Sequence, residues 1–196
     1  MSAKSGWVLL VAVGVVLSLA AGSSSAGKAG ASATASVSDA GFVLCEGVYA
    51  LCTTALCAPV AGQEGLLSCK CSVQDGYSAG QVCNGPKDTP AGKMIYSRYH
   101  PIRSYVACNN SRPWAWCLDV PCLIDADNPL QATATCSCKV TSSPQSTYVA
   151  VTDFYSEAAC ATGIISSASV PDVDGITRFF YSKRPPPHPI KVLTKP

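Results

Sequence analysis

The sequence predicts a mainly β, small disulfide-rich protein built from two tandem homologous six-cysteine repeats that follow an N-terminal signal peptide. Three observations support this class: 12 cysteines in 196 residues, a cysteine spacing that occurs twice, and a short apolar segment near the N-terminus. Hydrophobic residues make up 48% of the chain, charged residues 13%, and the formal charge is +2. This composition excludes a largely disordered chain and a coiled coil.

Residues 1–35 have the layout of a secretory signal peptide followed by a linker of small residues. Lys4 provides a basic start, and Trp7 to Ala21 form an uncharged apolar run. Three alanines offer candidate cleavage sites: Ala26, Ala33 and Ala35. The alternative is an uncleaved membrane anchor, but the apolar run of 15 residues is shorter than the ~20 that span a bilayer. We therefore expect a secreted protein, periplasmic or extracellular, with no mature transmembrane segment.

The cysteines all lie after this segment and are even in number. Thiols tend to oxidise outside the cytosol, so all of them can pair. We expect disulfides formed within each repeat by Cys45, Cys52, Cys57, Cys69, Cys71 and Cys83, and by Cys108, Cys117, Cys122, Cys136, Cys138 and Cys160. Units this short bury little apolar surface, and a disulfide typically adds ~2–4 kcal/mol, so the bridges are expected to hold the fold together.

The spacing of the cysteines repeats along the chain. The first set reads C-x6-C-x4-C-x11-C-x-C-x11-C and the second reads C-x8-C-x4-C-x13-C-x-C-x21-C. Flanking residues repeat as well, since S-C-K-C-S-V (68–73) matches T-C-S-C-K-V (135–140) and each set is followed by H-P-I and a basic residue. We predict repeat 1 at 43–104 and repeat 2 at 105–192. Repeat 2 carries an insertion at about 141–152, which we expect to add one strand in a surface loop.

Alternating residues predict strands as the main element. Residues 66–73 and 134–141 place cysteines on one face and Ser or Lys on the other. The segments 49–57 and 114–122 also favour extended structure, and turn-forming residues separate them from the strands that follow. Each repeat is therefore expected to contain a β-hairpin. Folding back around the turns suggests two pairings, Cys57 with Cys69 and Cys122 with Cys136, while the rest of the connectivity stays open.

Two weaker patterns complete the predicted elements. Y-S-A-G-Q-V-C (77–83) and Y-S-E-A-A-C (155–160) favour a short helical turn in each repeat. I-Y-S-R-Y (95–99) and F-F-Y-S-K (179–183) are rich in aromatic residues and favour a strand that closes each repeat.

The sequence contains no recognisable catalytic motif. It has no G-x-S-x-G and no H-E-x-x-H, and its two histidines, His100 and His188, both lie in the H-P-I segments. We expect no enzyme, no catalytic residue, no cofactor and no metal site. The near-zero charge also offers no basic field for nucleic acid. The alternative is a metal-handling (Cu or Zn) or thiol-redox protein that uses the two C-x-C pairs as thiolates.

Aromatic residues at the junction of the repeats form the candidate binding surface. They are Tyr96, Tyr99, His100, Tyr105, Trp114 and Trp116. Tyr and Trp are favoured at recognition surfaces, and the alternative is that these side chains pack the junction between the repeats. Asn109 begins an N-N-S glycosylation sequon.

The C-terminal tail is basic and rich in proline. From Arg178 onward it has five basic and no acidic residues, whereas residues 36–177 have 7 basic and 12 acidic ones. The Pro-rich part favours an extended conformation without internal hydrogen bonds, and we expect a solvated tail rather than one folded on the acidic body. Taken together, the patterns predict an exported, non-catalytic, disulfide-stapled protein with a binding or structural role. A protein or an envelope surface is the kind of partner that we expect.

Overall fold

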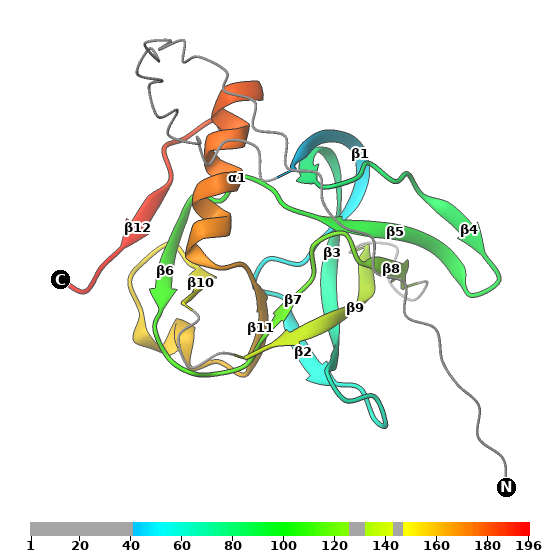
Figure 1. Cartoon of the computed structure of the whole chain (residues 1–196), viewed down its shortest axis with the longest axis horizontal. Helices are drawn as coiled ribbons and strands as arrows, with labels where there is room; N and C mark the ends of the chain where they lie inside the picture. The colour runs from blue at the N-terminus through cyan, green and yellow to red at the C-terminus, as the bar shows by residue number, and fades with distance from the viewer. Residues whose placement is uncertain (1–40, 126–131, 143–146) are drawn as a thin grey trace, which may run out of the picture. The chain divides into compact units, whose positions relative to one another are not determined.

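The computed structural model describes residues 41–125, 132–142 and 147–196, so the predicted signal peptide lies outside the described residues. In this part of the chain the protein is mainly β, as predicted, with one α-helix and one short 3-10 helix (Figure 1). The elements are β1 (Val43–Leu51), β2 (Leu56–Pro59), β3 (Leu66–Gly80), β4 (Lys87–Thr89), β5 (Gly92–Arg98), β6 (Ser104–Cys108), β7 (Trp114–Trp116), β8 (Pro121–Ile124), β9 (Thr133–Thr141), β10 (Tyr148–Val151), η1 (Glu157–Cys160), β11 (Ile164–Ser167), α1 (Val170–Lys183) and β12 (Lys191–Leu193).

The two longest predicted strands form for the expected reason. In β3, Leu67, Cys69 and Cys71 are buried while Lys70 and Ser72 are exposed. In β9, Ala134, Cys136 and Cys138 are likewise buried. Because successive side chains of a strand point to opposite faces, this alternation buries one face of each strand and leaves the other in solvent.

Nine strands form one sheet that closes on itself. Their order is β1-β3-β2-β11-β7-β9-β8-β5-β4, and β1 also pairs with β5 while β3 also pairs with β9. The extra pairings divide the sheet into two rings that share the β3–β9 pair. One ring contains β1, β3, β9, β8 and β5, and the other contains β7, β9, β3, β2 and β11. Closure satisfies the backbone groups that an open edge would leave unpaired.

An approximate two-fold axis relates the residues before β6 (41–103, the first half) to those from β6 onward (104–196, the second half). Cys69 of β3 lies opposite Cys136 of β9, and each is the fourth cysteine of its set. On either side of this pair, Leu67 lies opposite Cys138 and Cys71 lies opposite Ala134. Exchanging the two cysteine sets converts one of these pairs of positions into the other. The register of this central pair is therefore the same from either half.

The two halves also exchange strands. β5 of the first half pairs with β8 of the second, with Ile95 opposite Cys122. β11 of the second half pairs with β2 of the first, with Ile164 opposite Cys57. The described residues accordingly belong to one compact unit. Neither half completes a ring with its own strands.

Six disulfides join the cysteines, and the described residues contain no free cysteine. Both pairings suggested by the hairpin turns are present, Cys57–Cys69 and Cys122–Cys136. In each half the first cysteine bonds the sixth, the second the fifth, and the third the fourth. The remaining bridges are Cys45–Cys83, Cys52–Cys71, Cys108–Cys160 and Cys117–Cys138.

The insertion in the second half forms a buried strand. β10 was expected from its sequence, but it lies in the interior rather than in a surface loop, since Tyr148, Val149 and Ala150 are all buried. It pairs with β6 in a second sheet of order β10-β6-β12. Its apolar residues pack under α1, where Val149 and Val173 belong to one cluster.

The prediction of a closing strand at 179–183 is wrong, because these residues end α1. Ser169 caps this helix, since its hydroxyl accepts a hydrogen bond from the Asp172 N–H and the Asp172 carboxylate accepts one from the Ser169 N–H. Pro171 lies in the first turn, where its missing N–H costs nothing. The buried residues Val173, Ile176 and Phe180 share one face at helical spacing.

Two further predictions need correction. The segment 77–83 does not form a helical turn, because β3 continues to Gly80 in pairing with β1; in the second half the turn is present as η1. The tail is not a solvated extension. Its first residues belong to α1, Arg184 lies over the Tyr77 ring at 3.9 Å, and β12 pairs in parallel with β6 (Figure 1). Within the described ranges, no helix combines the length and the hydrophobicity that crossing a bilayer requires.

Candidate binding pocket between the two halves

A largely apolar pocket lies between α1 and one end of the closed sheet. Its volume is about 620 Å³, counted together with the open space at its mouth. The buried residues Val173, Ile176 and Phe180 of α1 line it, and so do Leu118 and Val149. Pro186 and Ile190, from the chain that connects α1 to β12, also line it. Both halves of the protein therefore contribute to this pocket.

Corresponding positions of the two halves meet at the floor of the pocket. Thr53 directly follows the second cysteine of the first set, and Leu118 directly follows the second cysteine of the other set; both line the pocket. Arg98 and Ser167 occupy matching positions in the parallel pairings of β5 with β1 and of β11 with β7. They also line the pocket. The pocket accordingly lies at the approximate two-fold axis.

The loops behind this floor have the same unusual backbone conformation. Thr54 has φ 60° and Asp119 has φ 57°, a region that residues other than glycine seldom adopt. The Thr54 N–H donates to the Ser166 carbonyl at 2.9 Å, and the Asp119 N–H donates to the Ser97 carbonyl at 3.1 Å. The two turns are therefore held by the same backbone hydrogen bond at matching positions.

The halves differ in charge at this point. The Arg98 guanidinium, with only 2% of its side chain exposed, forms an ion pair with the Asp119 carboxylate. Asp119 also accepts a hydrogen bond from the Gln81 N–H at 2.6 Å. Burial lowers the pKa of Arg98, while the charge of Asp119 acts in the opposite direction. On the other side of the axis, the matching positions hold the uncharged Ser167 and Thr54.

Gly80 makes room for this ion pair. A Cβ atom at Gly80 would lie 2.6 Å from both Arg98 Cδ and Asp119 Oδ1, closer than side-chain atoms can approach. The glycine in Y-S-A-G-Q-V-C, which the sequence marks only as a weak helix former, is therefore a packing requirement of the pair.

His100 lies at the exposed rim of the pocket. Its Nδ1 is 3.1 Å from the Tyr49 hydroxyl and 3.3 Å from the Tyr77 carbonyl oxygen. Burial raises the pKa of Tyr49 to about 12 and also raises the pKa of Tyr99 and of Tyr105. These tyrosines are thus held in the neutral, hydrogen-bonding form.

We expect alkaline pH to destabilise the fold through Tyr49. Its pKa is about 12 in the folded protein and about 10 in an unfolded chain. The unfolded state therefore loses its proton first, and stability present below pH ~10 is lost as the pH rises toward ~12, by about 2–3 kcal/mol. Urea unfolding at pH 9 and pH 11 checks this. Between these two pH values, Tyr49→Phe should lose less stability than the parent protein. The control Tyr181→Phe, at an exposed position, should lose as much stability as the parent protein. Equal losses in all three proteins would contradict the assignment.

The predicted aromatic surface does not form one exposed face. Tyr105 and Trp114 are 2% and 3% exposed and belong to different apolar clusters. The Tyr99 hydroxyl accepts a hydrogen bond from Trp116 Nε1 at 3.1 Å, and Tyr96 lies 5.5 Å from the Arg98 guanidinium. Of the six residues, Tyr99 and His100 line the pocket. Tyr105 and Trp114 are therefore core side chains, which agrees with the packing alternative given for these aromatic residues.

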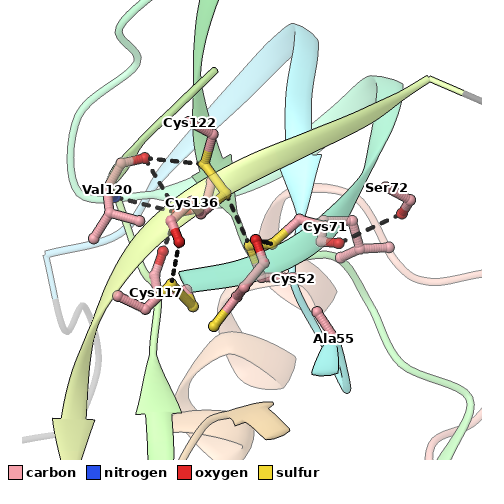
Figure 2. Close-up of a disulfide and its surroundings, with 12 residues drawn as sticks. Cys52, Ala55, Cys71, Ser72, Cys117, Val120, Cys122 and Cys136 are labelled. Atoms are coloured by element: carbon pink, nitrogen blue, oxygen red, sulfur yellow. Dashed lines mark hydrogen bonds between the residues drawn. A yellow bond between two sulfur atoms is a disulfide. The ribbon is translucent and has the colours of Figure 1, made fainter. Parts of the chain in front are cut away.

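Sulfur atoms of several disulfides lie close together in the interior, where Figure 2 labels Cys52, Cys71, Cys117, Cys122 and Cys136. Cys52 Sγ lies 3.4 Å from Cys136 Sγ, although each belongs to a different disulfide. Two groups of three sulfur atoms are present, and within each group the atoms lie no more than 4.8 Å apart. One group is Cys52, Cys122 and Cys136, and the other is Cys52, Cys117 and Cys138. A disulfide sulfur carries no negative charge and is a poor metal ligand, because thiolate is the ligating form. Holding a metal here would first require reduction of buried bridges.

Sequence reasoning missed Arg98, Asp119 and the α1 residues of the pocket. A signal for part of the floor does exist, because Thr53 and Leu118 each follow the second cysteine of a set. No family model, curated protein or solved structure gives a significant match to this chain.

Proposed function

We propose that this protein is an exported, non-catalytic binding protein whose ligand occupies the pocket between the two halves. The observation that carries the proposal is a mainly apolar cavity bordered by few polar groups and built on a disulfide-linked frame. Pockets of this composition are the usual binding sites of small molecules. Rigid walls favour binding because little conformational freedom is lost when the ligand enters.

The origin of the pocket supports the same proposal. We infer that the two halves derive from one duplicated unit. Three observations support this: the order of disulfides within each half, the positive φ at Thr54 and Asp119, and the matching hydrogen bonds to Ser166 and Ser97. A duplicated unit that associates around a two-fold axis brings equivalent residues together at that axis, and differences between the copies then make the site asymmetric.

Export is supported by the six disulfides. Such bridges form and persist in oxidising compartments and are rare in the cytosol of most organisms. The metal-handling or thiol-redox alternative needs accessible thiolates, and the C-x-C cysteines are buried in disulfides.

A thiol count and ligand extraction test the proposal together. We expect full-length protein, produced with its own N-terminal segment in a secreting host, to contain no free thiol when unfolded without reductant. Solvent extraction of the native protein should release a small molecule in near-equimolar amount. Thr177→Trp, which fills the pocket from α1, should release none, whereas Arg178→Trp on the exposed side of the same helix should release the same amount. Several reactive thiols, or bound copper or zinc, would instead support the alternative.

A further inference from the structure

We propose that the pocket takes an uncharged, largely apolar small molecule that directs one hydrogen-bonding group to the hydroxyl-bearing floor. This inference rests on the proposed function and adds the chemical class of the ligand. Charge, hydrogen-bonding groups and the shape of the walls each support it.

The lining of the pocket carries little charge. Among the described residues that line it, Arg98 is the one Lys, Arg, Asp or Glu. The Asp119 carboxylate neutralises the Arg98 guanidinium. Arg98 Nη1 also donates to the Ser97 carbonyl at 2.9 Å, and Arg98 Nη2 donates to the Asn84 carbonyl at 3.4 Å. An anionic ligand would therefore find its natural partner already occupied. Burying an ionic group without a partner is strongly unfavourable, so the pocket selects against charged ligands.

Hydroxyl groups give the pocket its hydrogen-bonding capacity. Thr53, Ser166 and Thr177 all line it. Ser166 is only 2% exposed. A hydroxyl group can both donate and accept a hydrogen bond, so each of these can pair with a ligand carbonyl or hydroxyl. One neutral polar group on the ligand is enough to satisfy this floor.

Apolar side chains also line the pocket. Val173, Ile176 and Phe180 share one face of α1, and Leu118 and Val149 line the pocket together with them. Contact with these side chains favours a ligand whose remaining surface is hydrocarbon, because apolar surface gains free energy when it leaves water.

Two fluorescent probes that differ by one charged group test the ligand class. N-phenyl-1-naphthylamine is neutral, and 1-anilinonaphthalene-8-sulfonate is the same molecule with an added sulfonate. We expect the neutral probe to bind the full-length, oxidised protein saturably at one site. We expect the sulfonate to bind at least about tenfold more weakly, which corresponds to ~1.4 kcal/mol.

Pocket-filling variants show where the probes bind. Thr177→Trp in α1 and Leu118→Trp outside it should each abolish binding of the neutral probe, while Arg178→Trp should leave it unchanged. If both probes bind with similar affinity and the pocket variants abolish both, the ligand class is wrong and the proposed function stands. If neither probe binds, or if the pocket variants bind as well as Arg178→Trp, the pocket is not a binding site and both proposals fail. Variants are compared only when their thiol content and circular dichroism match the parent, and having two pocket variants keeps the test open if one misfolds.

Discussion

Cleavage of the chain between its two halves should leave fragments that remain together in native buffer and separate in urea without any reductant. All six disulfides lie within one half or the other, so no covalent bond would join the fragments. They would nevertheless be held by the pairing of β3 with β9 and by the exchanged strands β5 and β11. Two halves that had folded as separate modules would drift apart on cleavage.

A protease site inserted between Pro101 and Ile102, outside any strand, provides the test. Size-exclusion chromatography of the cut protein should give the parent's elution volume in native buffer and two smaller species in urea. A matched control places the same site between Gly62 and Gln63, in the turn between β2 and β3. Its fragments should stay joined in urea until reductant is added, because Cys57–Cys69 spans that turn. Separation of the first cut protein in native buffer would show that the strand exchange is absent or weak.

Removing the charge of Asp119 should destabilise the protein by about 3 kcal/mol. Breaking a buried ion pair by changing one partner typically costs ~3–5 kcal/mol, because the other charge is left buried and unpaired. We place the effect at the lower end of this range because 17% of the Asp119 side chain is exposed. Asp119→Asn is the informative change, since asparagine tolerates the positive φ of this position and isolates the loss of charge.

Denaturant unfolding with the disulfides intact measures this effect. Asp88→Asn, on the exposed strand β4, is the control and should change stability by less than about 0.5 kcal/mol. The double variant Arg98→Met with Asp119→Asn should recover part of the loss, because it removes the unpaired charge as well. If Asp119→Asn is as mild as Asp88→Asn, the pair does not hold the floor of the pocket.

Local patterns were sufficient for the parts of the fold that depend on neighbouring residues. The alternation in 66–73 and 134–141 predicts strands because a two-residue period is a property of the segment itself. The pairings Cys57–Cys69 and Cys122–Cys136 were suggested because each closes a short hairpin across an evident turn. Residues near in sequence have few ways to meet, so spacing carries most of the information.

Helix α1 shows where local patterns misled. Its last turn contains F-F-Y-S-K, whose aromatic residues favour a strand, and its interior contains Gly175 and several β-branched residues that are poor helix formers. The cap formed by Ser169 and Asp172 and the burial of Ile176, Phe179 and Phe180 outweigh those preferences. Most of the stability of a helix in a protein comes from packing of its apolar face, and a propensity scale does not contain that packing.

Cysteine pairing in disulfides, a strand-rich fold and a cysteine spacing that occurs twice can all be predicted from the order of the amino acids, because each is a property of composition or of short-range periodicity. Strand exchange between the halves, the burial of Trp114 and Tyr105, the Arg98–Asp119 pair and the pocket beneath α1 could not. These features join residues that are far apart in the sequence, such as Arg98 and Asp119, which are separated by 21 positions. Contacts of this length depend on how the whole closed sheet packs, and many alternative packings are compatible with the same local patterns.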